Sequence, residues 1–233
     1  MQESTKIIIP PLNKYKLYIF DLDGTLYDQQ ILRRIIFRKI LAGLVKLKYS
    51  FTEIRIIGEF RRQRELHKGY SSDNLEAEQY SWCADKLKIP LERVKKTIDH
   101  FIFRFPLQFL HQSKYKNIDR VFATLKDLKL KTAVYSDYPA KEKLEALNLN
   151  IDLHVCSMDS SIAQLKPNAS GLLKICNALN IPKDETVFIG DREDTDGESA
   201  RMAGTDFIKV NVKEARRGDF FSAFQKKLIS AYD

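Results

Sequence analysis

The chain has 233 residues, of which 44% are hydrophobic and 30% are charged, and it carries a formal net charge of +8. This balance excludes a disordered or low-complexity chain and fits one domain, or one domain with an insertion. It favours anionic partners, although a merely basic surface would give the same charge. No apolar stretch reaches the roughly 18 residues of a membrane-spanning helix, and the three cysteines and four histidines show no metal-binding motif. We therefore expect a soluble, cytoplasmic protein.

The first predicted element is a short apolar strand at residues 17–20, and Asp21 and Asp23 follow it directly. A continuous apolar run of this length is typical of a strand that is buried on both faces of a parallel sheet. Aspartate is unfavourable in strands and costly to bury without a partner. The pair therefore indicates either a turn or a functional site.

Residues 29–114 contain no convincing strand. Their periodicity predicts four helices, at residues 31–48, 52–67, 75–88 and 91–103. We expect these helices to form an all-helical domain over residues 29–114. That domain would be inserted into an α/β domain made of residues 1–28 and 115–233.

The first helix of the insertion is basic. Residues 31–48 contain six arginines and lysines and no acid, beside a broad apolar stripe. The first interpretation is a packed helix with a solvated basic face. The alternatives are docking to an anionic membrane surface, a lipid-linked phosphate substrate, or a bulky polyanion such as a nucleotide.

From about residue 116 onward, strands alternate with helices. The strands are predicted at residues 132–135, 153–156, 186–189 and 206–210. The helices are predicted at residues 118–128, 140–147, 169–179, 194–203 and 220–229. This alternation predicts an α/β fold with a doubly wound parallel sheet.

Polar side chains follow four of the strands, at the carboxyl ends where ligands bind in open α/β sheets. They are Asp21, Asp23, Ser136, Lys166, Asp191 and Asp196. Converging carboxylates repel one another unless a hard cation lies among them, and oxygen ligands suit Mg²⁺. A carboxylate beside Mg²⁺ can attack phosphorus, while a second carboxyl protonates the leaving oxygen and activates water. A lysine and a hydroxyl can bind the phosphate oxygens.

Four short motifs resemble those of the haloacid dehalogenase-like phosphohydrolase superfamily. DLDGTL at residues 21–26 resembles the DxDGT motif, and YSD at residues 135–137 resembles the second motif. The Lys-Pro pair at residues 166–167 resembles the third, and GDREDTD at residues 190–196 resembles the fourth. The predicted helical insertion is similar to the α-helical cap of subfamily I members. The resemblance implies a Rossmann-like core and covers essentially the whole chain.

The resemblance assigns roles to the acidic residues. Asp21 would be the nucleophile and a Mg²⁺ ligand. Asp23 would be the general acid and base, with its backbone carbonyl also on the metal. Asp191 would bind Mg²⁺ directly, and Asp196 would support the metal or its waters.

Other residues would act on the phosphate. Lys166 would balance the charge of the nucleophile and the phosphoryl group, Thr25 would fix the loop, and Ser136 would bind phosphate oxygens. Asp137 departs from the usual second motif, so it either belongs to the phosphate-binding loop or caps the following helix. Asp194 adds a carboxylate to the fourth motif, where a helix N-terminal acid is favoured over a metal ligand.

Together these features predict a Mg²⁺-dependent phosphatase that hydrolyses a small phosphomonoester through an aspartyl-phosphate on Asp21. Dehalogenase members lack the second aspartate of the first motif, so Asp23 favours phosphoryl transfer. A phosphomutase of the same superfamily and a catalytically silent basic binding module remain as alternatives. No specific nucleic-acid partner is expected, and the sequence does not predict an oligomeric state.

Overall fold

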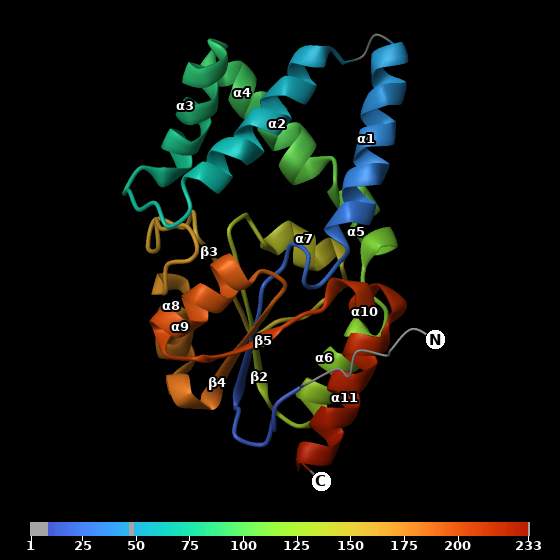
Figure 1. Ribbon diagram of the computed structural model, residues 1–233, viewed down its shortest axis with the longest axis vertical. Coiled ribbons are helices and arrows are strands. Elements are labelled where there is room, and N and C mark those ends of the chain that lie inside the picture. The colour runs from blue at the N-terminus through green and yellow to red at the C-terminus, as the bar shows by residue number, and fades with distance from the viewer. Residues whose placement is uncertain (1–8, 47–48, 233) are drawn as a thin grey trace.

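The computed structural model describes residues 9–46 and 49–232, and a five-stranded parallel sheet lies at its centre (Figure 1). The strands are β1 (Leu17–Phe20), β2 (Lys131–Ser136), β3 (Leu153–Cys156), β4 (Thr186–Gly190) and β5 (Asp206–Lys209). Their order in the sheet is β3-β2-β1-β4-β5. All five predicted strands are present, and the predicted doubly wound α/β fold is confirmed.

Both faces of the sheet are covered, which explains the uninterrupted apolar strands. Every residue of β1 and β4 is buried. Tyr18 and Phe20 pack with α6 (Ile118–Asp127) and α11 (Asp219–Tyr232), whereas Leu17 and Ile19 pack with α8 (Ser170–Leu179) and α9 (Glu198–Ala203). Figure 1 shows these helix pairs on opposite sides of the sheet. Alternate residues of one strand therefore serve two cores.

The order in which the chain adds strands to the sheet reverses between β1 and β4. The chain places β2 and β3 on one side of β1 and then returns to place β4 and β5 on the other. Phe20 lies opposite Ile189 in the ladder, and the next backbone N–H, that of Asp21, donates to the Ile189 carbonyl at 2.8 Å. The loops after β1 and β4 consequently leave the sheet side by side, at the position where open α/β sheets bind ligands.

Helices fill the chain between β1 and β2, and Figure 1 shows the first four gathered at one end of the molecule. The helical elements before α6 are α1 (Gln29–Val45), α2 (Phe51–Leu66), α3 (Leu75–Leu87), α4 (Leu91–Ile98), the π-helical segment η1 (Asp99–Arg104) and α5 (Leu107–Ser113). Helices are present at all four predicted positions, although residues 47–48 of the first prediction lie outside the described residues. The helix predicted at residues 91–103 is divided into α4 and η1, and α5 was not predicted. Pro106 is the N-cap residue of this short helix, next to the first helical position that proline favours. The domain boundaries stay a prediction.

Further short elements lie beside the sheet. They are α7 (Lys141–Ala146), the 3₁₀ turn η2 (Lys183–Glu185), the π-helical segment η3 (Glu193–Gly197) and α10 (Val212–Arg217). Three of them follow the carboxyl ends of strands, whereas η2 precedes β4 at the opposite edge. The single helix predicted at residues 194–203 is thus divided into η3 and α9. Neither α10 nor η2 was predicted, because each has too few residues to show a helical period.

Asp28 fixes the point where the chain enters α1. Its buried carboxylate accepts hydrogen bonds from the N–H groups of Gln30 and Ile31, at 2.8 and 3.1 Å, and so caps the helix. The same carboxylate forms an ion pair with Arg216 of α10. The start of the helical segment is therefore attached to the C-terminal part of the chain.

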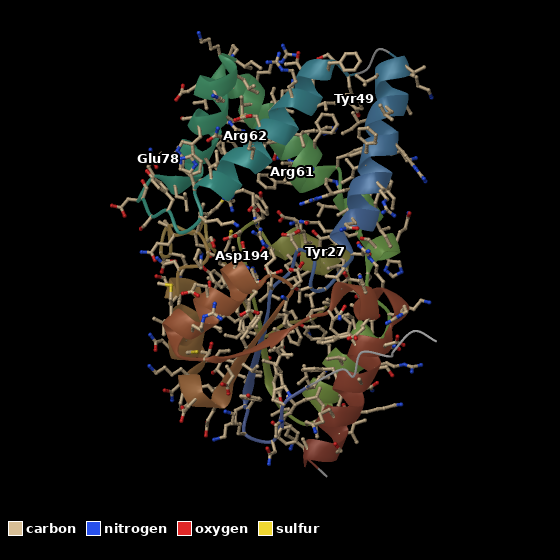
Figure 2. The ribbon with its side chains drawn as sticks, viewed as in Figure 1. Tyr27, Tyr49, Arg61, Arg62, Glu78 and Asp194 are labelled. Atoms are coloured by element: carbon tan, nitrogen blue, oxygen red, sulfur yellow. The ribbon has the colours of Figure 1, made fainter. Side chains whose placement is uncertain are left out.

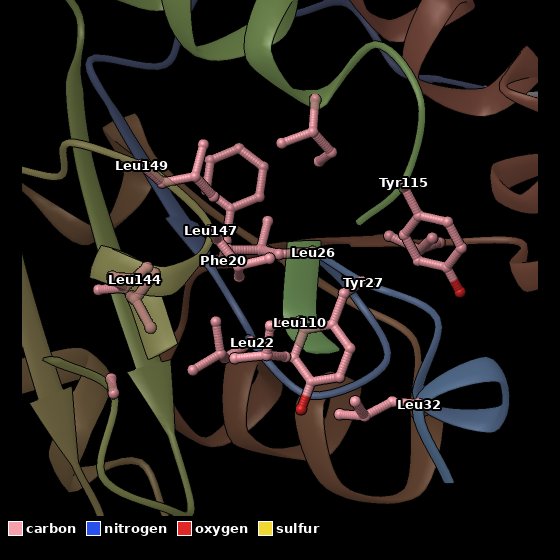
Figure 3. Close-up of a cluster of buried hydrophobic side chains, with 14 of the residues drawn as sticks. Phe20, Leu22, Leu26, Tyr27, Leu32, Leu110, Tyr115, Leu144, Leu147 and Leu149 are labelled. Carbon is pink, nitrogen blue, oxygen red and sulfur yellow. The ribbon is translucent and has the colours of Figure 1, made fainter. Parts of the chain in front are cut away.

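Apolar side chains anchor the loop that follows β1. Figure 3 shows Leu22, Leu26 and Tyr27 beside Leu110 of α5 and Leu144 of α7. All five are buried in one hydrophobic cluster. The buried apolar residues of this loop thereby hold in place the polar residues that lie next to them in the sequence. In the part of the chain that the structure describes, no helix combines the length and apolarity needed to cross a membrane.

Candidate active site

Three carboxylates meet at the carboxyl edge of the sheet. Oxygens of Asp21, Asp191 and Asp196 all lie within 4.8 Å of one another. They come from the end of β1, the end of β4 and η3. The Lys166 Nζ lies between two of them, 2.6 Å from Asp21 and 2.7 Å from Asp196. Four residues selected from the sequence are thus brought together.

Two glycines permit this close approach. A Cβ atom on Gly24 would lie 2.6 Å from Asp191 Oδ2, and its φ of +106° is one that other residues rarely adopt. A Cβ on Gly190 would lie 2.5 Å from Asp196 Oδ2. Thr25 donates a long hydrogen bond of 3.5 Å to Asp191 Oδ1. Thr25 and the two glycines therefore position the carboxylates.

The cluster has more negative than positive charge. Burial and the neighbouring Asp196 raise the pKa of Asp191 to about 6. Burial also raises the pKa of Asp21 well above its usual range, although Lys166 opposes the shift. Burial alone would lower the pKa of Lys166, but Asp196 and Asp21 outweigh it and raise that pKa. One lysine among three close carboxylates leaves room for a hard divalent cation, and the all-oxygen donor set fits Mg²⁺.

Asp23 lies in a different environment. Both of its oxygens accept hydrogen bonds from Lys143 Nζ, at 2.6 and 2.8 Å, and Tyr27 also donates to it. Ser136 Oγ lies 3.5 Å away. Burial opposes the ionisation of Asp23, but Lys143 and Tyr27 hold its pKa below the usual range. The two aspartates of DLDGTL are thus separated, one in the carboxylate cluster and one in an ion pair.

Sequence reasoning missed Lys143 and Tyr27. The Lys143 side chain is only 6% exposed, yet a lysine in a charged helix normally indicates a solvated face. It reaches Asp23 because the short helix α7 begins just after the carboxyl end of β2. Tyr27 lies four residues beyond Asp23, and only the bend of the intervening chain brings the two together.

Asp137 links its own loop to the loop between β3 and α8 and to helix α2. Its carboxylate accepts hydrogen bonds from Ser157 Oγ at 2.6 Å and from the Lys166 N–H at 3.2 Å. Its carbonyl accepts from Arg64 of α2 at 2.7 Å. The suggested cap of the next helix is wrong, because α7 begins after Ala140 and has no side-chain cap. Asp137 holds the loop of Lys166 instead and also lines the pocket described next.

A pocket of about 290 Å³ lies over the carboxylates, between the sheet edge and the helices α1 and α2. Its acidic floor contains Asp21, Asp23, Asp137, Asp191 and Asp196, with Lys166 among them. Its roof contains Arg33, Arg61, Arg62, Arg64 and Lys68. Figure 2 shows Arg61 and Arg62 on the helical side and Tyr27 and Asp194 on the side of the sheet. Such a pocket can take an anion from above and a metal ion below.

Exposed ion pairs join floor and roof at one side. Asp194, in the first turn of η3, pairs with Arg192 and with Lys68, which follows α2. Arg192 also pairs with Glu65 of α2, with an N···O distance of 2.6 Å. Asp194 is not one of the three clustered carboxylates, so the favoured reading of it as a helix N-terminal acid fits its position.

Comparisons with known proteins agree with this geometry. A family model described as haloacid dehalogenase-like hydrolase matches residues 15–204. A glyceraldehyde 3-phosphate phosphatase from Methanopyrus kandleri is 23% identical, over 88% of this chain and 85% of its own. A phosphoglycolate phosphatase from Psychrobacter arcticus is 28% identical, over 93% of this chain and 97% of its own.

Solved structures show the same fold. A HAD-superfamily hydrolase of subfamily IA from Geobacter sulfurreducens is 20% identical, with a TM-score of 0.55, over 84% of this chain and 87% of its own. A 2-haloacid dehalogenase from Pseudomonas syringae is also 20% identical, with a TM-score of 0.55, over 84% of this chain and 86% of its own. Because the family model spans most of the sequence, the chain belongs to the haloacid dehalogenase-like hydrolases.

Proposed function

We propose that this hydrolase is a Mg²⁺-dependent phosphatase that cleaves a small phosphomonoester through an aspartyl-phosphate on Asp21. The observation that carries the proposal is that the two aspartates of the first motif lie in different environments. Asp21 lies in the carboxylate cluster beside Lys166, and Asp23 lies 2.6 Å from Lys143. Both curated relatives are named as phosphatases, and Asp23 favours phosphoryl transfer over the dehalogenation that some structural neighbours are named for.

Asp21, Asp191 and Asp196 would hold the metal ion, and the Asp23 carbonyl is a further predicted ligand. When bound, Mg²⁺ would supply the positive charge that offsets these carboxylates and the phosphate. Lys166 would remain between Asp21 and Asp196, where it favours the ionised form of the nucleophile and holds its position. Ser136 would donate to a phosphate oxygen.

In the first step an Asp21 oxygen attacks phosphorus, the ester P–O bond breaks, and the leaving oxygen takes a proton from Asp23. In the second step Asp23 takes a proton from water, the water oxygen attacks phosphorus, and the P–O bond to Asp21 breaks. Lys143 keeps Asp23 ionised in this structure, which is the form that the second step needs. An entering phosphate dianion raises the pKa of Asp23 and so favours the protonated form that the first step needs.

Replacement of the nucleophile tests the mechanism. Asp21→Asn should lower Mg²⁺-dependent hydrolysis of p-nitrophenyl phosphate about 10³-fold or more, because an amide does not attack phosphorus. Asp184→Asn makes the same chemical change at an exposed residue of η2 and should leave the rate unchanged. Substantial turnover by Asp21→Asn would contradict the proposal.

Replacement of the acid tests the second role. Asp23→Asn should reduce hydrolysis of an alkyl phosphate more than hydrolysis of p-nitrophenyl phosphate, because nitrophenolate leaves without a proton. Equal losses for the two esters would rule out proton transfer by Asp23. Release of free phosphate, rather than an isomerised sugar phosphate, separates the proposed reaction from that of a phosphomutase. The cytoplasmic location stays a prediction.

A further inference from the structure

We propose that the substrate is amphiphilic, with its phosphate over the carboxylate cluster and an apolar chain in a groove between α1 and α2. This inference rests on the proposed function and names the class of phosphomonoester that the site takes. Four observations carry it: the lining of the groove, its position beside the pocket, the charge at the junction, and the open space at one glycine.

The groove has a volume of about 170 Å³ and an apolar lining. Its walls are Ile36, Phe37, Ile40, Ile54, Ile57, Gly58 and Phe101, and Arg33 and Arg61 complete it at one end. These residues come from α1, α2 and η1. Phe37 is 52% exposed, so an apolar occupant would remove its ring from water.

The groove adjoins the pocket over the carboxylates. Arg33 and Arg61 line both the groove and the pocket over the carboxylates. A smaller cavity of about 50 Å³ shares the same two arginines and extends to Asp23 and Lys143. The two arginines therefore lie next to both the groove and the site, so a ligand whose head they bind can extend an apolar chain along the groove.

The two arginines give this junction a positive charge. Within residues 9–46 and 49–232, neither of them makes a side-chain hydrogen bond or an ion pair. Arg61 is half-buried, and burial together with the nearby Arg33 lowers its pKa. Figure 2 places Arg61 between α2 and α1. The two arginines repel each other at one end of an apolar groove, and an anion bound between them would relieve this repulsion. They therefore fit a ligand whose anionic head adjoins an apolar chain.

The length of the groove suits a medium chain. Arg33 and Ile40 are seven residues apart on α1, which corresponds to about 10 Å along the helix and to an alkyl chain of about eight carbons. Leu41 and Val45 continue the exposed apolar face of α1 beyond this point. Longer chains would therefore still find apolar surface.

Gly58 keeps the groove open. It lies inside α2, where glycine is less favourable than alanine or leucine. A Cβ atom added there would meet no other atom within 4 Å. Alanine therefore fits at this position without a clash, and leucine would extend from the same open position into the groove. Because both residues improve the helix, a comparison between them isolates the effect of the larger side chain.

The experiment measures kcat/KM for ethyl, butyl, hexyl, octyl and decyl phosphate, below their micelle concentrations. In the native chain, kcat/KM should rise about 10- to 100-fold from butyl to decyl phosphate, because each methylene leaves water in the groove. Gly58→Leu should remove most of this rise, and Gly58→Ala should retain most of it. A native enzyme that hydrolyses p-nitrophenyl phosphate but shows no chain-length dependence would overturn this inference and leave the phosphatase proposal intact.

Binding tests the groove apart from catalysis. Decylphosphonate and butylphosphonate have no ester bond, so calorimetry reports their affinity even if the protein hydrolyses none of the phosphates. Decylphosphonate should bind the native chain at least tenfold more tightly than butylphosphonate, and Gly58→Leu should abolish the difference. Equal affinities of decylphosphonate and butylphosphonate for the native protein would overturn the inference that the groove binds an apolar chain. Tight binding that depends on alkyl length, without any hydrolysis, would overturn the proposed function alone.

Discussion

Cationic side chains at the sheet edge are paired with carboxylates, whereas two arginines on the helices above it are not. At the sheet edge, Lys166 and Lys143 are buried, and each lies 2.6 Å from a carboxylate. On the helices, Arg33 and Arg61 face the same pocket, and the described residues supply neither with an ion-pair partner. The difference separates cations that hold the clustered acidic residues in place from cations that remain available to a ligand. Variants of the first kind should affect stability and catalysis, and variants of the second kind should affect binding.

Loss of Lys166 should have the largest effect. Lys166→Met leaves two buried carboxylates without their cation, which should cost about 3–5 kcal/mol of unfolding free energy near pH 8 and nearly all phosphatase activity. The unpaired carboxylates bind protons more tightly in the folded state, so the lost stability should return as the pH falls towards 5. Urea denaturation at both pH values measures this, with Lys183→Met as an exposed control. A loss of equal size at both values would show that charge is not the cause.

Removal of divalent cations should have the next largest effect. The pKa of Asp191, raised to about 6 by burial and Asp196, means that the metal-free folded state binds a proton more tightly than the unfolded chain. That stabilisation is complete below about pH 4 and is lost as the pH rises through about 6. In EDTA, the unfolding free energy should therefore fall by about 1–2 kcal/mol between pH 5 and pH 8. Mg²⁺ should restore it at pH 8 and have little effect at pH 5, and equal stabilisation at both values would contradict the assigned site.

Loss of Lys143 should change the pH dependence of catalysis. Without this cation the pKa of Asp23 rises. In Lys143→Met the acidic limb of the pH–rate profile should therefore shift to higher pH by about one unit, with an activity loss of about tenfold near pH 6. Lys141→Met changes an exposed lysine at the start of the same helix and is the matched control. A lower rate with an unshifted profile would make Lys143 a packing residue only.

Loss of Arg61 should have the smallest effect on stability. Arg61→Met removes a cation that repels Arg33, so the unfolding free energy should change by no more than about 0.5 kcal/mol. KM for phosphate esters should rise about tenfold while kcat changes little, because the lost interaction acts on the bound anion. Arg55→Met, an exposed change on the same helix, should leave both constants unchanged. A large fall in stability would place Arg61 with the paired cations of the sheet edge.

The sequence predicted the fold well where burial leaves a simple pattern. A strand covered on both faces, such as β1, is an uninterrupted apolar run, and the polar residues after such runs meet at one edge of the sheet. Asp21, Lys166, Asp191 and Asp196 could therefore be grouped before their contacts were known. The family resemblance independently supplied their roles.

Other features depend on contacts that no local pattern records. Lys143 belongs to a charged helix and is distinguished only by its burial against Asp23. The helix α5 has seven residues in a phenylalanine-rich segment, too few to show a helical period. Asp137 was assigned to the phosphate loop or to a cap, whereas its hydrogen bonds to Ser157 and Lys166 connect loops that are distant in sequence.

The contacts between the helical segment and the rest of the chain differ in how strongly salt affects them. At the start of α1, the buried Asp28 carboxylate joins the helix cap to Arg216. At the end of α2, Glu65 and Lys68 reach Arg192 and Asp194 only through exposed ion pairs, each worth at most about 1 kcal/mol and weakened by salt. Beside these ion pairs, the Gly69 N–H donates to the Lys166 carbonyl at 3.0 Å, and the Leu165 N–H donates to the Tyr70 carbonyl at 2.9 Å. Salt therefore weakens only the exposed, ion-paired part of this contact, whereas the backbone hydrogen bonds keep the turn after α2 against the loop that carries Lys166.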